Sequence, residues 1–517
     1  MDVEPYPHFS TTMCESCDHT FNHNRYRSDS IISALRFNHF PEAHEAGKIL
    51  EAIDVIDTEY ERYDPEILRE RCRSVLAPVR KLPPEILQAI FLLLRGSEPE
   101  VVVPDVAQVC SHWRTVALGT PELWSIVSAG RTRFSYSQRY HDLLALFLER
   151  SSIQPVSLTI RNPVDTRFVE LVRRHSHRWR SLRLSSTNIR FYHELTQAFE
   201  RSTFQMLERL VIVDATAELE PGQGVDPGDP GIALFRDAPK LHDVVLKNPL
   251  ALWRLPWIQL TRLQYDADAA ADGLRVVQLC PRLVECSLDK LRVPADVDLS
   301  PFYPSSKLRS LRLAVDTRRA QAGESIVHSF FACLTTPILI SLEVVGQWSP
   351  VDFTKFLSRT QCQLENLTLG TGYMKDDKII LVLESLPLLK TLVLDADVGT
   401  SRQLQNRVIT DKLLRRLTFF PDSDSLLPCL THLALRTAVN FEDQVLVDVI
   451  ESRWTPWVAE LYGMPVSRLA SFDLQLRGKK EHLAPFTVEQ FRELFADGLR
   501  ISLQQGTEKI SLVSSDN

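Results

Sequence analysis

The sequence predicts an α/β protein in which a small N-terminal helical unit precedes an irregular solenoid, a parallel sheet with flanking helices. Three observations lead to this prediction: a leucine string that recurs along the chain, a proline before many of its copies, and a dense apolar segment around residue 100. At 517 residues the chain is too long for one ordinary hydrophobic core, which also favours several domains or a repeat array.

The recurring string has the pattern L-x-x-L-x-L. Its copies lie at residues 207–212, 241–246, 260–265, 283–288, 308–313, 339–344, 364–369, 389–394 and 430–435, with weaker copies at 179–184 and 469–474. Several copies start about 25 residues apart, within the ~20–29 residues of a leucine-rich repeat. Longer intervals indicate insertions, such as the Pro-, Gly- and Asp-rich loop at 221–231.

Proline stands two residues before many copies of the string, at Pro239, Pro281, Pro337, Pro387 and Pro428. A helix-like run precedes it, for example at 232–238 and at 378–386. Because proline ends a helix and favours extended backbone, each unit should be a helix, a stop and a strand. Strand residues alternate between faces, so the fourth and sixth string positions should enter the core and the third and fifth should face outward.

We expect the solenoid to occupy residues 129–480, and a capping helix with a tail to occupy residues 481–517. Residues 487–490 read Thr-Val-Glu-Gln, which suggests a capping box at the start of that helix. An amphipathic helix there would cover the open end of the array.

Three segments precede the repeats. Residues 1–42 are polar and without sustained periodicity, which indicates a disordered tail. Residues 43–77 carry an apolar helical stripe that Asp64 and Pro65 interrupt, so two helices at about 43–63 and 65–76 are expected. Residues 78–128 form a compact helical unit with unusually apolar faces, and such small units tend to bury a face against a partner.

Within residues 78–128, the pair Pro83 and Pro84 can open a helix that Gly96 ends. Residues 97–103 form an acidic and apolar linker. From Pro104 onward, apolar residues keep helical spacing at Val106, Val109, Cys110, Trp113 and Val116, and a further short helix starts at Thr120.

Composition and charge exclude several classes of function. Lys and Arg total 59 against 66 Asp and Glu, and the net charge of −7 disfavours general nucleic-acid binding. No apolar run approaches ~18 residues and the N-terminus is unlike a signal peptide, so no membrane span is expected. The nine scattered cysteines suit a reducing compartment, so we expect the cytoplasm, the nucleus or both.

Motifs for metal binding and catalysis are weak or missing. Ligand types that suit zinc stand at Cys14, Cys17, His19 and His23. A single residue between the two pairs leaves almost no loop for a tetrahedral site, so a polar tail is the favoured interpretation. The sequence shows no nucleophile elbow and no phosphate-binding loop, so we expect no enzyme, no cofactor and no metal.

The apolar unit resembles a known family in its motifs. Residues 82–91 read LPPEILQAIF, residues 109–113 read VCSHW and residues 121–124 read PELW, a combination that resembles the F-box. Stretches at 74–87, 255–263, 426–435 and 445–454 resemble the expanded F-box families of mushroom-forming fungi. The chain is therefore similar to an F-box protein with a leucine-rich-repeat-like C-terminal domain, with residues 78–128 as the F-box.

The resemblance implies a substrate-recognition subunit of a Skp–cullin–F-box ubiquitin ligase. In this family the F-box binds a Skp-type adaptor, which links it to a cullin, and the repeats bind a target protein. A ligase-independent scaffold that uses the same two parts is the alternative. An enzyme is a third class, which the absence of motifs disfavours.

Candidate site residues follow for both parts. By the resemblance, the adaptor would contact Leu82, Pro83, Pro84, Glu85, Ile86, Ile90, Phe91, Val109, Cys110, Trp113, Leu123 and Trp124. Each of these could instead serve only to hold the helices together, because buried and interface apolar residues look alike in a sequence. For the target, the architecture suggests the outward strand positions Arg262, Glu285, Arg312, Glu343, Asn366 and Thr391.

Overall fold

A computed structural model describes the chain in segments. These are residues 42–51 and 73–75 in part, 76–94, 99–129, 138–161, 166–186, 189–213 except 201, 231–247, 253–292 except 268, 303–304, 307–316, 323–370, 374–396, 409–420, 426–455, 466–477, 482–506 and 508–512. They divide into two compact units, Met1–Trp179 and Arg180–Asn517. The zinc-type cluster, the expected polar tail around it and most of the two helices expected at 43–76 lie outside the described residues.

The first unit contains short helices followed by two repeat-like strands. The helices are η2 (Pro78–Lys81), α4 (Pro84–Leu94), α5 (Pro99–Val109), α6 (Ser111–Leu118) and η3 (Pro121–Trp124). The unit continues with β1 (Ile126–Ala129), α7 (Gln138–Arg150), β2 (Val156–Arg161), α8 (Thr166–Arg173) and η4 (Ser176–Arg178). Strands β1 and β2 pair in parallel.

Helix α4 begins at Pro84 as expected, because the fixed φ of proline suits a first helical turn. Two other details of these helices differ from the expectation. Residues expected as a linker at 97–103 instead contribute the first turns of α5. The helical run also breaks at Cys110, whose backbone is extended (φ −159°, ψ 172°). Its Sγ accepts a hydrogen bond from the Trp113 backbone N–H, with N and Sγ 3.4 Å apart, so Cys110 caps α6.

The second unit is a mostly parallel sheet with one strand per repeat. Its strands, in chain order and in order of pairing, are β3 (Trp179–Ser185), β4 (Arg209–Val213), β5 (Asp243–Leu246), β6 (Arg262–Asp266), β7 (Glu285–Leu291), β9 (Ser310–Val315), β11 (Ser341–Val345), β12 (Asn366–Gly370), β13 (Thr391–Asp395), β14 (His432–Thr437), β15 (Ser471–Leu476), β16 (Arg500–Gln505) and β17 (Glu508–Ile510). The last four residues of every leucine string lie on one of these strands, which confirms the predicted α/β fold class. Among the strand pairs of this unit that the structure describes, only β17 is antiparallel to its neighbour. Strands β8 (Tyr303–Pro304) and β10 (Leu334–Thr335) form a separate parallel pair.

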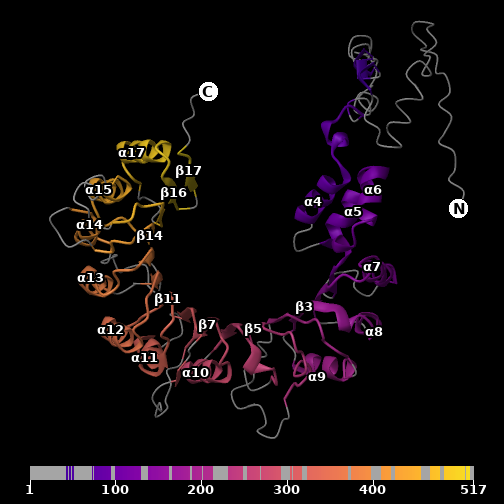
Figure 1. The fold of residues 1–517 in the computed structure, drawn as a ribbon, viewed down its shortest axis with the longest axis horizontal. Coiled ribbons are helices and arrows are strands. Elements are labelled where there is room, and N and C mark those ends of the chain that lie inside the picture. Colours follow the sequence, from indigo (N-terminus) through magenta and orange to yellow (C-terminus); the bar gives the residue numbers. More distant parts are fainter. Residues whose placement is uncertain are drawn as a thin grey trace, which may run out of the picture. The chain divides into compact units, whose positions relative to one another are not determined.

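Helices cover one face of this sheet. They are α9 (Ile189–Ala198), α10 (Ala270–Leu279), α11 (Gly323–Cys333), α12 (Pro350–Thr360), α13 (Asp376–Glu384), α14 (Asp411–Leu417), α15 (Asp443–Trp454) and α17 (Pro485–Ala496), with the 3₁₀ helix η6 (Trp257–Gln259) before β6. In Figure 1 the strands of the second unit follow the inner side of a curve and the helices lie on its outer side. Within the described residues, every helix is too short or too polar to traverse a lipid bilayer.

The two runs expected to be helical behave differently. Residues 378–386 lie largely in α13, as expected. Residues 232–238 form turns instead of a helix. Ile232 there pairs with Trp253 in a parallel bridge, which requires extended backbone, and too few residues then remain before Pro239 for a stable helix.

Leucine ladders form the core between sheet and helices. The fourth and sixth string positions of adjacent strands are in register, as where Leu367, Leu392 and Leu433 lie side by side. Leucines at the first position are also buried, at Leu207, Leu241, Leu260, Leu283, Leu308, Leu339, Leu364, Leu389, Leu430 and Leu469. Burial of one such side chain stabilises the fold by about 2 kcal/mol, so each added repeat extends one continuous core.

The array continues beyond the expected capping helix. Helix α17 starts at Pro485 with Ala484 as its N-cap, and Thr487 donates a hydrogen bond to Asp443 Oδ2 (3.2 Å) instead of forming a capping box. Strand β16 follows and pairs with β15 in parallel. Its register places Gly498, not a leucine, at the first string position, which is why the leucine pattern did not reveal this strand.

Buried or half-buried arginines bind the carbonyl groups at the ends of preceding helices. Arg178 donates to Leu148 O (2.7 Å) in the last turn of α7, and Arg359 donates to Phe331 O in the last turn of α11. Arg453 is fully buried and donates to Leu417 O (2.6 Å), the last residue of α14. The final carbonyl groups of a helix have no hydrogen-bond partner within it and carry partial negative charge. An arginine at this place supplies the missing donors and also a favourable positive charge.

Arg453 makes the most complete of these caps. Its guanidinium also donates to Leu426 O (2.5 Å) and Leu427 O (3.1 Å). Burial lowers the pKa of Arg453 to about 10, so the side chain remains charged at neutral pH.

Replacement of Arg453 tests this cap. Arg453→Met should lower the free energy of unfolding by about 3 kcal/mol, because it leaves three buried carbonyl groups without their donor. The matched control is Arg415→Met, on the exposed side of α14, which should cost less than about 0.5 kcal/mol. Urea denaturation followed by circular dichroism compares the two variants, and equal losses would show that the buried cap contributes nothing.

Candidate functional site

One side of α4 belongs to the core of the first unit. Leu87 and Phe91 lie one turn apart and are both fully buried. The centre of the Phe91 ring lies 5.0 Å from that of Trp113 on α6, so the two rings pack together. Phe91 thus fixes α4 against α6.

The end of the helical segment is anchored in the same core. Leu123 and Trp124 on η3 are buried, and the indole Nε1 of Trp124 donates to Ala117 O at 2.9 Å. The Trp124 ring lies edge-on to Phe147 of α7, with ring centres 4.9 Å apart. These residues are almost entirely buried and hold the helices in place.

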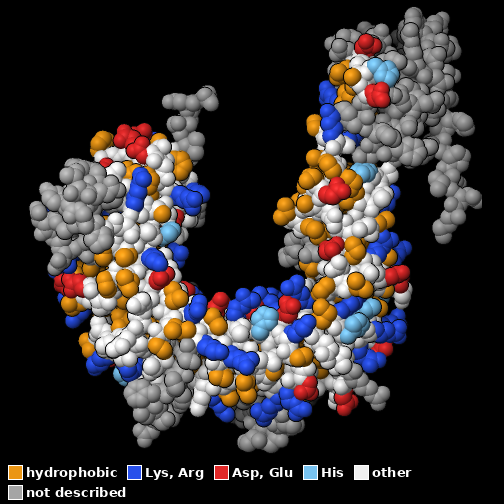
Figure 2. Space-filling model, viewed as in Figure 1, with side chains coloured by type: hydrophobic (Ala, Val, Ile, Leu, Met, Phe, Trp, Pro, Cys, Tyr) orange, Lys and Arg blue, Asp and Glu red, His pale blue; other side chains and the backbone are white. Residues whose placement is uncertain are grey.

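The adjoining side of α4 is apolar and open to solvent. Ile86 is 48 % exposed, Leu93 is 84 % exposed and Leu94 is 54 % exposed. With the half-buried Ile90, they recur at spacings of four, seven and eight residues, which places them along one side of the helix. We call Ile86, Ile90, Leu93 and Leu94 the α4 face. Figure 2 shows hydrophobic side chains gathered on the side of this unit where α4 lies.

The α4 face carries little charge. Glu85 is the one ionisable residue of α4, and it lies in the first turn, where the helix dipole favours a carboxylate. A partner that covered this face would therefore desolvate apolar surface with almost no buried charge, which is the favourable case for binding.

The residues expected to contact the adaptor fall into three groups. Phe91, Leu123 and Trp124 are buried in the unit's own core, so they support the surface from beneath. Leu82, Ile90, Cys110 and Trp113 are half-buried. Pro83, Pro84, Glu85, Ile86 and Val109 are exposed and able to meet a partner directly.

Leu93 and Leu94 are the exposed residues that the sequence reasoning missed. A signal for them exists, because residues 92–94 are three consecutive leucines, more than one buried helix face can accommodate. The core of the unit uses Leu87 and Phe91 of this helix, and Leu93 and Leu94 lie on the part of the helix surface that remains exposed.

A second candidate surface is the outward side of the repeat strands. Arg262 is in register with Glu285 and Asn366 with Thr391, and all four side chains are exposed or half-buried. Arg312 bonds Glu343 on the next strand. The six positions proposed for target contact thus form three pairs of neighbours across strands.

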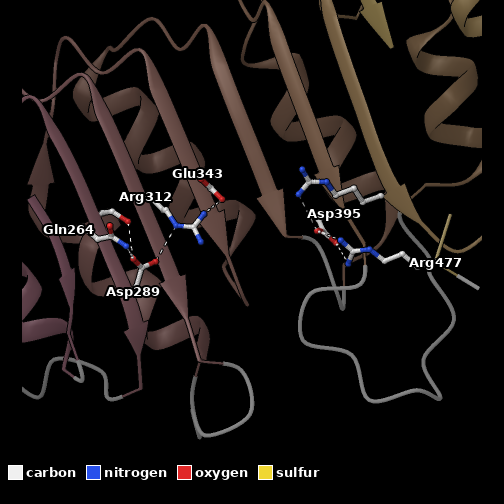
Figure 3. Close-up of polar contacts among 8 residues, drawn as sticks. Gln264, Asp289, Arg312, Glu343, Asp395 and Arg477 are labelled. Atoms are coloured by element: carbon white, nitrogen blue, oxygen red, sulfur yellow. Dashed lines mark hydrogen bonds and ion pairs between the residues drawn. The ribbon is translucent and has the colours of Figure 1, made fainter. Parts of the chain in front are cut away.

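A chain of polar contacts links four of these strands (Figure 3). Gln264 Nε2 donates to Asp289 Oδ2 at 3.0 Å, Arg312 Nε donates to Asp289 Oδ1 at 3.1 Å, and Arg312 continues to Glu343. Burial opposes charge on Arg312, but hydrogen bonds from its guanidinium to Glu343 and Asp289 raise the pKa of Arg312 above its usual value. Arg312 therefore remains charged inside a largely satisfied network.

Substitutions on the two sides of α4 should separate core from surface. Phe91→Ala should destabilise the first unit by about 3–5 kcal/mol, because it removes a fully buried aromatic ring. Leu93→Ala should cost less than about 0.5 kcal/mol, since that side chain is already in water. Hydrogen–deuterium exchange of the α4 and α6 amides in the full chain measures both effects. Equal protection in the two variants would contradict the assignment of Phe91 to the core.

Comparison with known proteins bears on the first unit. No curated protein matches the chain. Residues 79–128 match the family model described as F-box-like. F-box domains bind Skp-type adaptors, and F-box proteins are generally non-enzymatic. The chain therefore carries an F-box-like domain, which supports a role as an F-box adaptor in ubiquitin ligase complexes.

Proposed function

We propose that the chain is the substrate-recognition subunit of a Skp–cullin–F-box ubiquitin ligase. The F-box-like match at residues 79–128 carries this proposal. The α4 face would bind the Skp-type adaptor, and the outward side of the leucine-rich-repeat-like sheet would bind the target protein. The chain itself would perform no chemistry.

The exposure of the α4 face supports adaptor binding. Full burial of an exposed leucine or isoleucine contributes about 1.5–3 kcal/mol, so Ile86, Leu93 and Leu94 together can supply the centre of a stable interface. The exposed Pro83, Pro84 and Val109 would extend this contact. Glu85 would lie at its polar rim.

The remaining residues of the motif would act through the position of α4. The half-buried Leu82, Cys110 and Trp113 lie between core and surface and would meet the adaptor with part of their area. The buried Phe91 and Trp124 would hold the helices in the orientation that the contact needs.

The mechanism would be an increase in effective concentration. A target held on the repeat sheet would lie near the enzyme that transfers ubiquitin, so an encounter between separate molecules becomes one within a complex. The paired outward residues Arg262–Glu285, Arg312–Glu343 and Asn366–Thr391 are the proposed points of target contact.

Affinity purification tests the adaptor contact. Ile86→Asp/Leu93→Asp should reduce recovery of the Skp-type adaptor at least about tenfold, because two carboxylates would be desolvated at the centre of the interface. Leu381→Asp is the matched control: Leu381 is as exposed as Ile86 but lies on α13 in the second unit, so adaptor recovery should not change. Equal recovery of the adaptor by all three proteins would overturn the proposed contact.

The same purification separates the ligase subunit from the scaffold. A ligase subunit should recover a cullin together with the adaptor, and should lose both in the Ile86→Asp/Leu93→Asp variant. Recovery of adaptor without cullin would favour a ligase-independent scaffold.

A further inference from the structure

Exposed arginine side chains gather on the first strands of the second unit, three of them at outward string positions. Arg180 and Arg183 lie on β3, Arg209 lies on β4 and Arg262 lies on β6, and all four are exposed. Figure 2 shows Lys and Arg side chains along the inner side of this part of the sheet. We call these four residues the arginine face.

Two of these arginines share one carboxylate. The Nη1 of Arg209 lies 3.4 Å from Asp243 Oδ2, and the Nη2 of Arg262 lies 3.0 Å from the same oxygen. The Asp243 side chain is only 10 % exposed, whereas both arginines are about half exposed. A guanidinium has five N–H donors, so one shared oxygen leaves most of these donors directed to solvent or to a partner.

The other two arginines increase the local positive charge. Arg180 pairs with Glu208 at 2.8 Å but keeps most of its side chain in water. Arg183 has no ion-pair partner among the residues that the structure describes. The whole chain carries a net charge of −7, so four neighbouring exposed arginines differ in sign from the average of the protein.

Apolar side chains lie next to the arginines. Arg183 is in register with Val211, which is in register with Val245, and both valines occupy outward positions. With Val213 they form a small buried cluster. Surroundings of low polarity strengthen charge-assisted hydrogen bonds. The hydrogen bonds between these arginines and a bound carboxylate would therefore be stronger than on an open polar surface.

We propose that the arginine face binds an extended acidic segment of the target protein, rich in Asp and Glu. The inference rests on the proposed function only for the statement that the partner is the target. Arginine recognises carboxylates through two parallel N–H···O bonds, and the sheet offers such donors on several neighbouring strands. Asp243 lies between Arg209 and Arg262, and Glu208 and Glu285 are neighbours of these arginines. The three carboxylates would repel the uninterrupted charge of a nucleic-acid backbone, which favours a peptide with spaced charges.

The dimensions suit a short peptide. Three strand spacings of about 4.8 Å separate β3 from β6, which is about 14 Å. An extended chain covers about 3.3 Å per residue, so a probe of about eight residues spans the face with a margin at each end.

Fluorescence polarisation with the full chain tests the proposal. The probe is a labelled peptide of about eight residues that alternates Glu with Ser, and the reference peptide carries Gln in place of Glu. The Glu peptide should bind at least about tenfold more tightly than the Gln peptide, and this difference should shrink as salt screens the charges. Equal binding of the two peptides would overturn the proposal.

Variants locate the site. Arg183→Gln/Arg209→Gln/Arg262→Gln should weaken binding of the Glu peptide at least about tenfold, and Arg183→Gln alone, which breaks no ion pair of the described chain, should weaken it about threefold. Asp243→Asn should tighten binding, because it removes the internal competitor for both guanidiniums. The matched control is Arg436→Gln/Arg477→Gln, which alters two arginines that share Asp395 in a similar way far along the sheet and should leave binding unchanged.

Three outcomes would contradict the inference. They are wild-type affinity in the single and triple arginine variants, a loss of affinity in the Arg436→Gln/Arg477→Gln control as large as that in the triple variant, and tighter binding of a single-stranded oligonucleotide than of the Glu peptide. Adaptor recovery by the same preparations keeps the two proposals apart. A chain that recovers the adaptor but ignores the Glu peptide retains the proposed function and loses this inference. A chain that binds the Glu peptide as described but recovers no adaptor retains this inference and loses the proposed function.

Discussion

In-register parallel pairing of the leucine strands is the constraint on which the second unit depends. Parallel neighbours cannot be joined by a tight turn, so each strand needs a crossover segment that returns the chain to the same edge. Where that segment is a helix, its apolar side covers the leucines, as α13 does between β12 and β13. The same register also aligns the outward positions, so side chains about one repeat apart in sequence become neighbours, as Arg262 and Glu285 do. The parallel register of the strands therefore produces both the leucine core and the candidate binding surface.

The arginines that cap helix ends are a consequence of this geometry. Helices α7, α11 and α14 end where the chain that follows packs against them, and their last carbonyl groups find donors there. Arg178, Arg359 and Arg453 supply donors from the chain that follows, without a carboxylate among the bonds described here. Most of their partners are carbonyl oxygens at or just after the end of the preceding helix, so each arginine links two successive segments. In an array where repeats contact mainly their neighbours, such ties add to the cooperativity of the whole.

The first unit shows how one motif serves two purposes. The residues that resemble the F-box include Phe91 and Trp124, which are sealed in the core, and Ile86, which is open to solvent. All three are large and apolar, and the chemistry of the side chains does not distinguish them. Phe91 and Ile86 differ because α4 packs one side against α6, whereas Ile86, Leu93 and Leu94 on its adjoining side are exposed. An exposed apolar face on a small helical unit is typical of a docking surface.

The sequence by itself determined the repeats, the strand positions and the start of α4, because these depend on local spacing and on the fixed backbone of proline. The fourth and sixth string positions were predicted to be buried for the same local reason, and they are. Only the tertiary structure decided which apolar residues between 82 and 124 remain exposed, that the helix breaks at Cys110, and that β16 extends the sheet with a glycine where the pattern has leucine. It also decided the ion pairs, since Asp395 and Arg477 meet across 82 residues of chain. Exposure and long-range pairing depend on which segments become neighbours in space, and local periodicity carries no information about that.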